Sequence, residues 1–166
     1  MLMIAALAGA CALNAQNPLS TEVKASYTGV KNNLIKAAEK MPEEDYSFKP
    51  TPEVQTWAQR VAHIADANAG SCGRIKGETK SVGAASKTSK ADLVAALQES
   101  FAYCDGVFDS MTDADAVTTV SGGRGPARSK LALEWGVVTH SNELYGVMGV
   151  YLRLKGIVPP SSEPRR

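Results

Sequence analysis

The sequence predicts an all-α domain, a four-helix bundle with a long connection between its second and third helices. Apolar residues recur at steps of three and four along four segments, which is the spacing of one buried helix face. Stretches rich in proline, glycine or serine separate these segments, and none of them shows the two-residue alternation of a strand. The 166 residues are enough for one domain that buries most of its apolar surface.

The first helix is expected over residues 20–41. Ser20 is a suitable N-cap, and Pro42 follows the last predicted turn. The apolar stripe consists of Val23, Tyr27, Val30, Leu34, Ala37 and Met41. The proline-rich stretch after this helix, MPEEDYSFKPTPE, is expected to be a connector anchored by Tyr46 and Phe48.

The second helix is expected over residues 52–74. Thr51 is predicted to be its N-cap, Pro52 suits the first turn, and Glu53 lies near the positive end of the helix dipole. The expected core side consists of Trp57, Val61, Ile64 and Ala65, and the adjoining stripe of Gln59, His63, Asp66 and Gly70. We interpret Trp57 as a core anchor.

Two polar connections flank the third helix. Residues 73–90 lack periodicity and form the expected long connection, and the third helix follows over 90–111 with Ser89 as its N-cap. Residues 112–128 are expected to be a second flexible connection without a strand. Its SGGRG run looks like a phosphate-binding loop, but no predicted strand precedes it and no Gly-Lys-Ser/Thr follows, so no nucleotide site is predicted.

The last helix is expected to begin at residue 131 and to stop at Gly156. Its predicted seam consists of Leu133, Val137, His140, Leu144, Val147, Tyr151 and Leu154. His140 is the one polar residue in this seam. Because an unpaired buried polar group costs on the order of 1–3 kcal/mol, this imidazole needs a hydrogen-bond partner or a metal. Trp135 is interpreted as a second core anchor.

Composition limits the choice of partners. The formal net charge is +1, with 18 basic and 17 acidic residues interspersed, so no nucleic-acid surface is predicted. Cys72 and Cys104 fall on the second and third predicted helices, and there is no CxxC motif. An oxidising compartment would permit a disulfide between them, but the interpretation as two buried small apolar residues is favoured.

The apolar start of the chain, residues 1–15, is too short for a membrane-spanning helix, which needs about 20 residues. It resembles the hydrophobic part of a signal peptide with a cleavage site after Ala15, although a basic segment before it is missing. We therefore expect export to the periplasm or the medium, a domain at 18–160, and a flexible tail at 161–166. The alternatives are a buried N-terminal helix in a cytoplasmic protein and a lipoprotein-type site at Cys11.

Two stretches resemble the DinB-like superfamily: PTPE leading into VAHIADAN, and THSNELYGVMGVYLRLKGIVPPS near the end. The resemblance covers nearly all of the chain from residue 20. It implies a bundle in up-down-down-up order, which a long crossover between the second and third helices permits. It also implies a divalent-metal site with three imidazole ligands and an open position for water or a thiol.

The only two histidines of the chain, His63 and His140, match ligand positions of this family. The family's second histidine on the last helix is replaced by Leu144, which cannot bind a metal. Asp66 and Glu143 are auxiliary candidates, either as a third ligand or as groups that orient an imidazole. Three alternatives stay open: a complete three-ligand site, weak binding of zinc, nickel or manganese by two histidines, and no physiological metal.

The expected function is therefore that of a DinB-like domain with a degenerate metal pocket, weak or absent catalysis, and a small-molecule ligand. The alternative is an active metal-dependent hydrolase or thiol-dependent transferase of this superfamily. No catalytic residue and no further cofactor site is assigned, and a homodimer stays open. Arg153 is a candidate for binding an anionic substrate, but pairing with an acid of the connector after the first helix is favoured.

Overall fold

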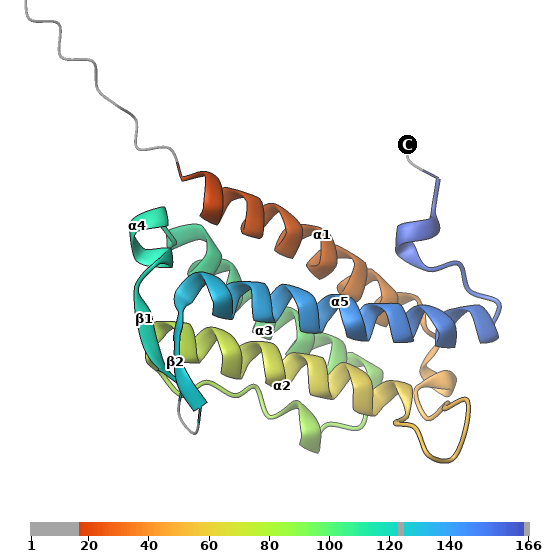
Figure 1. Cartoon of the computed structure of the whole chain (residues 1–166). Coiled ribbons are helices and arrows are strands. Elements are labelled where there is room, and N and C mark those ends of the chain that lie inside the picture. Colours follow the sequence, from red (N-terminus) through yellow and green to blue (C-terminus); the bar gives the residue numbers. More distant parts are fainter. Residues whose placement is uncertain (1–16, 123–124, 165–166) are drawn as a thin grey trace, which may run out of the picture.

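The computed structural model describes residues 17–122 and 125–164 and is dominated by four long helices (Figure 1). These are α1 (Pro18–Lys40), α2 (Trp57–Lys76), α3 (Lys90–Ser110) and α5 (Lys130–Leu154). Helices α1 and α5 run in one direction while α2 and α3 run in the other, which confirms the up-down-down-up order. Each helix packs against two others, because α1 and α2 both contact α3 and α5.

Short elements join the long helices. They are the 3-10 turns η1 (Glu43–Asp45), η2 (Ala84–Ser86) and η3 (Pro160–Ser162), helix α4 (Asp113–Ala116), and strands β1 (Thr119–Gly122) and β2 (Gly125–Ser129). The two strands pair antiparallel, with Val120 opposite Arg128. The expectation of a flexible, strand-free connection over 112–128 is therefore wrong. Val120 is partly buried and packs against the core, which anchors the hairpin to the bundle.

Helix α2 begins five residues later than predicted. Its N-cap is Thr56, not Thr51: the Thr56 hydroxyl accepts a bond from the backbone N–H of Gln59 (3.2 Å), and the Thr56 N–H donates to the Gln59 side chain (2.9 Å). The predicted connector anchors hold this start, since the N–H of Trp57 donates to the carbonyl of Phe48 (2.9 Å). The reciprocal contacts of Thr56 and Gln59 therefore set the start of α2. Residues 51–54, where the earlier start was predicted, form a turn.

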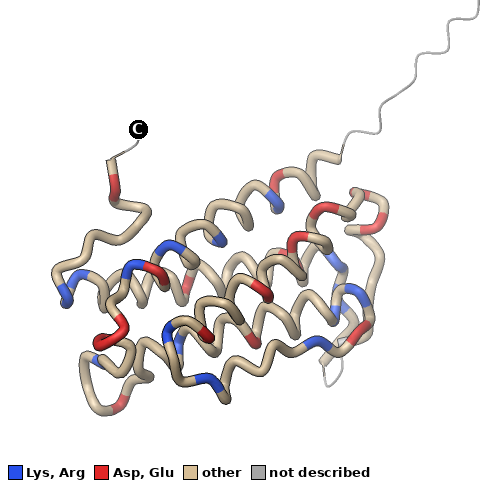
Figure 2. Tube along the Cα trace, turned by 180° about the vertical axis from the view of Figure 1, so that it is seen from behind, with Lys and Arg blue, Asp and Glu red and all other residues tan. Residues whose placement is uncertain are grey.

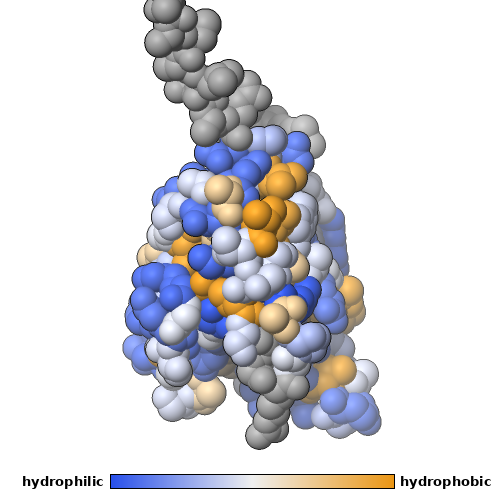
Figure 3. Space-filling model, turned by 60° about the vertical axis from the view of Figure 1, so that its left-hand side comes forward, coloured by the Kyte–Doolittle hydropathy of each residue, from blue (hydrophilic) through white to orange (hydrophobic). Residues whose placement is uncertain are grey.

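The core lies between the four long helices and confirms the predicted stripes of the first two. Fully buried large side chains come from all four helices: Tyr27 and Leu34; Trp57 and Ile64; Leu93, Leu97 and Phe101; Met148, Tyr151 and Leu152. Burial of each such side chain contributes about 1.5–3 kcal/mol. Leu19 and Val117 are exposed instead, and Figure 3 shows that apolar surface at the α4 end of the bundle is split into separate patches.

The predicted seam of α5 coincides with the buried face on one side only. Val137, Leu144 and Tyr151 are buried, whereas Val147 and Leu154 are 36% and 59% exposed. The buried face therefore lies beside the predicted seam and includes Val138, Tyr145, Met148 and Leu152. Trp135, which was expected in the core, is 41% exposed. The helix ends at Leu154 before Gly156, whose φ is +74°.

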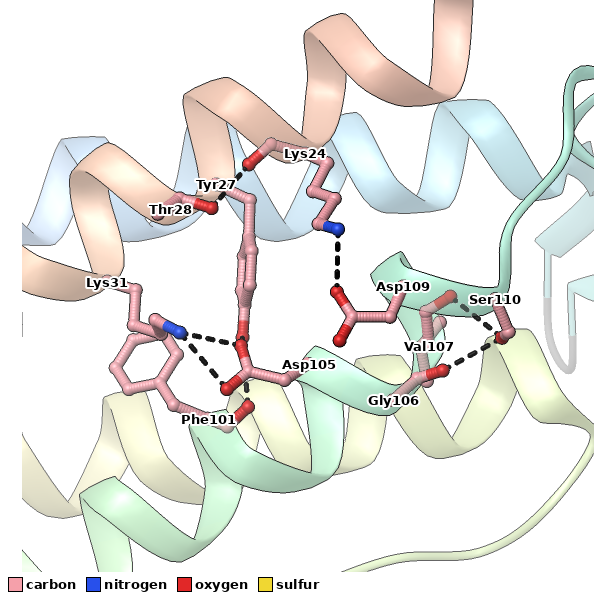
Figure 4. Close-up of polar contacts among 10 residues, drawn as sticks. All are labelled: Lys24, Tyr27, Thr28, Lys31, Phe101, Asp105, Gly106, Val107, Asp109 and Ser110. Carbon is pink, nitrogen blue, oxygen red and sulfur yellow. Dashed lines mark hydrogen bonds and ion pairs between the residues drawn. The ribbon is translucent and has the colours of Figure 1, made fainter. Parts of the chain in front are cut away.

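Helices α1 and α3 are joined by a row of polar contacts (Figure 4). Lys31 donates to both carboxylate oxygens of Asp105 (2.8 and 3.0 Å), and Lys24 pairs with Asp109 at 2.9 Å. The Tyr27 hydroxyl, between these pairs, lies 3.0 Å from Asp105 Oδ1. Burial and the Asp105 charge raise the pKa of Tyr27 above its ordinary range, so it remains a hydroxyl donor.

Acidic and basic residues are interspersed over the whole bundle (Figure 2).

Helices α2 and α3 are joined covalently. Cys72 and Cys104 are fully buried and form a disulfide, with their Cα atoms 5.4 Å apart. This corrects the favoured interpretation as two unlinked residues. The parallel packing of α2 and α3, which brings the two positions face to face, is what the sequence pattern alone did not reveal.

The two ends of the chain bear on other expectations. The expected signal peptide, residues 1–15, lies outside the described residues. The start of the expected flexible tail packs on the bundle, because the N–H of Ser161 donates to the Tyr145 hydroxyl (2.8 Å) and Lys40 pairs with Glu163 at 2.5 Å. No helix in the described part of the chain is both long and apolar enough to cross a membrane.

Candidate functional site

The two histidines of the chain meet between α2 and α5. The Nε2 atoms of His63 and His140 lie 3.2 Å apart, and the ring centres are 5.2 Å apart at an interplanar angle of 75°. Residues 77 positions apart in the sequence are thus brought into contact by the antiparallel packing of α2 on α5. The nitrogens that point at each other are the ones available to a ligand or a proton.

This histidine pair lies at the surface of the bundle rather than inside it. His63 is exposed and His140 is half-buried. The expectation that His140 lies in the middle of the buried seam is therefore wrong, because His140, like Val147, falls on the side of the predicted seam that borders solvent. Surface placement leaves the pair open to solvent and to small molecules.

The surroundings of His140 favour its neutral form. Partial burial lowers its pKa below the ordinary value, the adjacent His63 lowers it further, and the negative charge of Glu143 opposes both effects. A neutral imidazole carries the lone pair that a metal requires. In the absence of a metal, the same two nitrogens can share one proton as a hydrogen bond.

The separation of the two nitrogens fits two ligands of one ion. Imidazole nitrogens bind zinc at about 2.0–2.1 Å, so two of them on one ion are about 3.3 Å apart in tetrahedral geometry and about 2.9 Å in octahedral geometry. The observed 3.2 Å lies within this interval. The pair can therefore supply two coordination positions without a large movement of either helix.

A third protein ligand is missing from this arrangement. Leu144 lies one turn beyond His140, is only 8% exposed and packs in the core. Within residues 17–122 and 125–164 no three or more His, Cys, Asp or Glu side chains are grouped so as to hold a metal ion. The donor set therefore fits half of a tetrahedral shell and not the three protein ligands of a catalytic zinc site.

The two auxiliary acids have different surroundings. The Asp66 carboxylate accepts bonds from the backbone N–H groups of Ala84 (3.1 Å) and Ala85 (3.0 Å), one at each oxygen. Asp66 thus holds η2 against α2, a role that the sequence did not indicate. Glu143 is exposed and acts on His140 only through its charge.

An open hollow of about 490 Å³ adjoins His63. It lies between α2 and the connector after η2, and its polar lining includes Gln55, Gln59 and the half-buried Lys87. Sequence analysis did not single out Lys87, because it lies in a connection without periodicity. A small molecule in this hollow would have His63 within reach.

One turn before His63, Arg60 ties α2 to α5. Its Nε donates to the hydroxyl of Tyr151 (3.0 Å), which in turn donates to the carbonyl of Gln55 (2.8 Å). This chain of bonds joins the start of α2 to α5 about three turns beyond His140. Arg60 is a positioning residue that the sequence pattern did not reveal.

Arg153 does not make the contact that was expected of it. The acid of the connector is reached instead by Lys155, whose ammonium pairs with Asp45 at 2.6 Å. Arg153 is exposed. It lies in the last turn of α5, two residues before Lys155.

Known proteins share this fold. The sequence model of the DinB superfamily matches residues 27–144. A DinB-like protein from Bacillus cereus ATCC 10987 has 20% identity and a TM-score of 0.71, covering 84% of this chain and 95% of its own. A DinB-like protein from Bacillus subtilis has 18% identity and a TM-score of 0.70, covering 87% and 99%.

These two structures are similar to the present one in fold alone, at low identity. No match was found among curated proteins. The family match covers well over half of the chain and includes His63, His140 and Leu144. With the helix order and the histidine pair described above, it follows that this chain belongs to the DinB superfamily.

Proposed function

We propose that this protein carries a degenerate metal pocket of the DinB superfamily, which binds a divalent ion weakly through His63 and His140 and has weak or no catalytic activity. The observation that supports this is the 3.2 Å separation of the two Nε2 atoms beside a buried Leu144. Two imidazoles hold the ion, and the remaining positions are left to water or to donor atoms of a small ligand. Zinc, nickel and manganese suit such a site.

The alternative proposal is an active metal-dependent hydrolase or thiol-dependent transferase. It is favoured by the hollow of about 490 Å³ that opens beside His63, since this space can admit a substrate. A thiol or carboxylate of that substrate would then supply the missing third ligand. The two proposals differ in how tightly the resting protein holds its metal.

The test is metal binding by the purified protein without a histidine tag. Zinc, nickel and manganese are titrated into wild type, His63→Ala, His140→Ala and Leu144→His by calorimetry. We expect weak one-to-one binding by wild type, at least tenfold weaker binding by either alanine variant, and at least tenfold tighter binding by Leu144→His. Binding should also weaken in acid, because protonated imidazole cannot ligate.

Asn142→Ala is the matched control, since Asn142 is exposed on α5 two residues from His140. It should bind metal as wild type does. Glu143→Gln tests the auxiliary acid and should change affinity only slightly, through the lost charge near His140. Stoichiometric metal retained through purification would contradict weak binding and favour the enzyme. No gain in Leu144→His would mean that the three positions do not converge.

We also propose that the protein is exported. The signal-peptide-like segment at residues 1–15 motivates this, and the disulfide between Cys72 and Cys104 supports it, because such bonds persist in oxidising compartments. Expression of the full gene in a bacterial host should give a mature protein that begins after Ala15. An N-terminal sequence that starts at Met1 would count against export.

A further inference from the structure

A second hollow lies at the far end of α2, about three turns beyond His63. It has a volume of about 600 Å³ and is bounded by the end of α2, the connector that follows, and strand β1. Arg74 reaches it from α2, Thr79 and Lys80 from the connector, and Ser121 from the hairpin. The histidine pair takes no part in its lining.

Within the described residues no carboxylate forms an ion pair with Arg74, although Glu78 also borders the hollow. Its Nε atom is buried and has no hydrogen-bond partner within the described residues, while its terminal nitrogens are not among the buried unpaired atoms. Arg74 as a whole residue is half-buried. A charged group in this position is only partly hydrated. Binding of an anion from solution would therefore stabilise it.

The other charged groups around the hollow are already paired. Lys80 binds Glu99 at 3.0 Å on α3. Glu78 accepts a bond from the Tyr103 hydroxyl (3.0 Å) and pairs with Lys76 at 3.3 Å. These contacts leave Arg74 as the uncompensated charge of the lining, so the hollow carries a net positive charge.

The walls of the hollow are held in place by close packing. A Cβ added to Gly73 of α2 would come within 2.9 Å of the carbonyl oxygen of Glu78, so the connector lies directly on the helix. On the other side, Val120 packs against the core and positions Ser121. Thr79 and Ser121 thus border the hollow from different elements.

We propose that Arg74 anchors a binding site for a small oxyanion, a carboxylate or phosphate group of a metabolite. The planar guanidinium presents its terminal N–H groups as a fork that matches two oxygens of such a group. Thr79 and Ser121 can donate further hydrogen bonds from the rim. This site is separate from the histidine pair and does not depend on metal binding.

The experiment is an NMR titration of the whole protein at constant ionic strength, with sodium phosphate in one arm and sodium acetate in the other. The signals followed are the side-chain Nε–H of Arg74 and the backbone amides of Thr79 and Ser121. The variants are Arg74→Gln, Arg74→Lys and the control Arg153→Gln, which removes the same charge from an exposed position on α5.

Saturable shifts of these signals with either salt are expected in wild type and Arg153→Gln, with affinity reduced at least tenfold in Arg74→Gln. Arg74→Lys keeps the charge without the fork and should bind more weakly than wild type, which provides the comparison if Arg74→Gln does not fold. Saturation in one arm identifies that group as the ligand chemistry. Linear shifts in both arms, or equal affinity in wild type and the Arg74 variants, would overturn the proposal.

Discussion

At the scale of single residues, Glu134 is the most unusual side chain of the bundle. It lies on α5 with no exposed surface, and within the described residues neither carboxylate oxygen has a hydrogen-bond partner. Burial raises its pKa to about 7, from an ordinary value of 4.5. The carboxyl is therefore largely protonated in mildly acidic solution and ionised, at a cost, above neutrality.

This pKa predicts how stability depends on pH. Between about pH 4.5 and 7 the folded protein holds a proton on Glu134 that the unfolded chain has released, so this residue's contribution to stability falls as pH rises through that window. Glu134→Met replaces the acid by an apolar side chain of similar size. At pH 8 we expect the variant to be more stable than wild type by on the order of 1–3 kcal/mol, with a smaller difference at pH 5.

Urea unfolding at pH 5 and pH 8 measures this difference. The control is Glu22→Met, which makes the same exchange at an exposed position on α1 and should leave the pH dependence almost unchanged. A gain for Glu134→Met that is equal at both pH values would show that packing, and not ionisation, accounts for it. No gain at pH 8 would mean that the carboxylate finds a partner in solution.

The histidines show what sequence can predict at this scale. Their residue type, their rarity and the family resemblance were enough to choose His63 and His140, and the structure brings their rings together. The exposure of the two rings was not predictable, because the apolar pattern of α5 does not show on which side of the predicted seam the core lies. Arg74 was missed for another reason. It stands out only because the charged residues around it are paired with one another, and these pairs are defined by the packed structure.

At the scale of elements, the four long helices were predicted to within a few residues, except at the start of α2. Stripes such as Tyr27 to Leu34 identify a helix because every turn repeats the same requirement for burial. A start or a hairpin depends on one or two contacts instead. The Thr56 cap competes with an equally plausible Thr51, and the hairpin is anchored by Val120, so neither has a repeating signal in the sequence.

At the scale of the whole molecule, the crossover between α2 and α3 decides which helices become neighbours. Because these helices run in the same direction, Cys72 and Cys104 face each other near their C-terminal halves, although 32 residues separate them in the chain. The polar row between α1 and α3 and the Arg60–Tyr151 contact between α2 and α5 tie two further pairs of helices. The disulfide is therefore one covalent tie added to a bundle that already has a continuous core.

This arrangement predicts a protein that is weakened but still folded when the disulfide is broken. A cross-link that closes a loop of 32 residues restricts the unfolded chain by about 3–4 kcal/mol in the entropy model. We therefore expect Cys72→Ala/Cys104→Ala to lower the free energy of unfolding by about 2–4 kcal/mol, with the helical circular dichroism of the native state kept. Urea unfolding with and without reductant measures the effect. Reductant should weaken wild type by a similar amount and leave the double variant unchanged, whereas equal midpoints for oxidised and fully reduced wild type would show that the bond adds no stability.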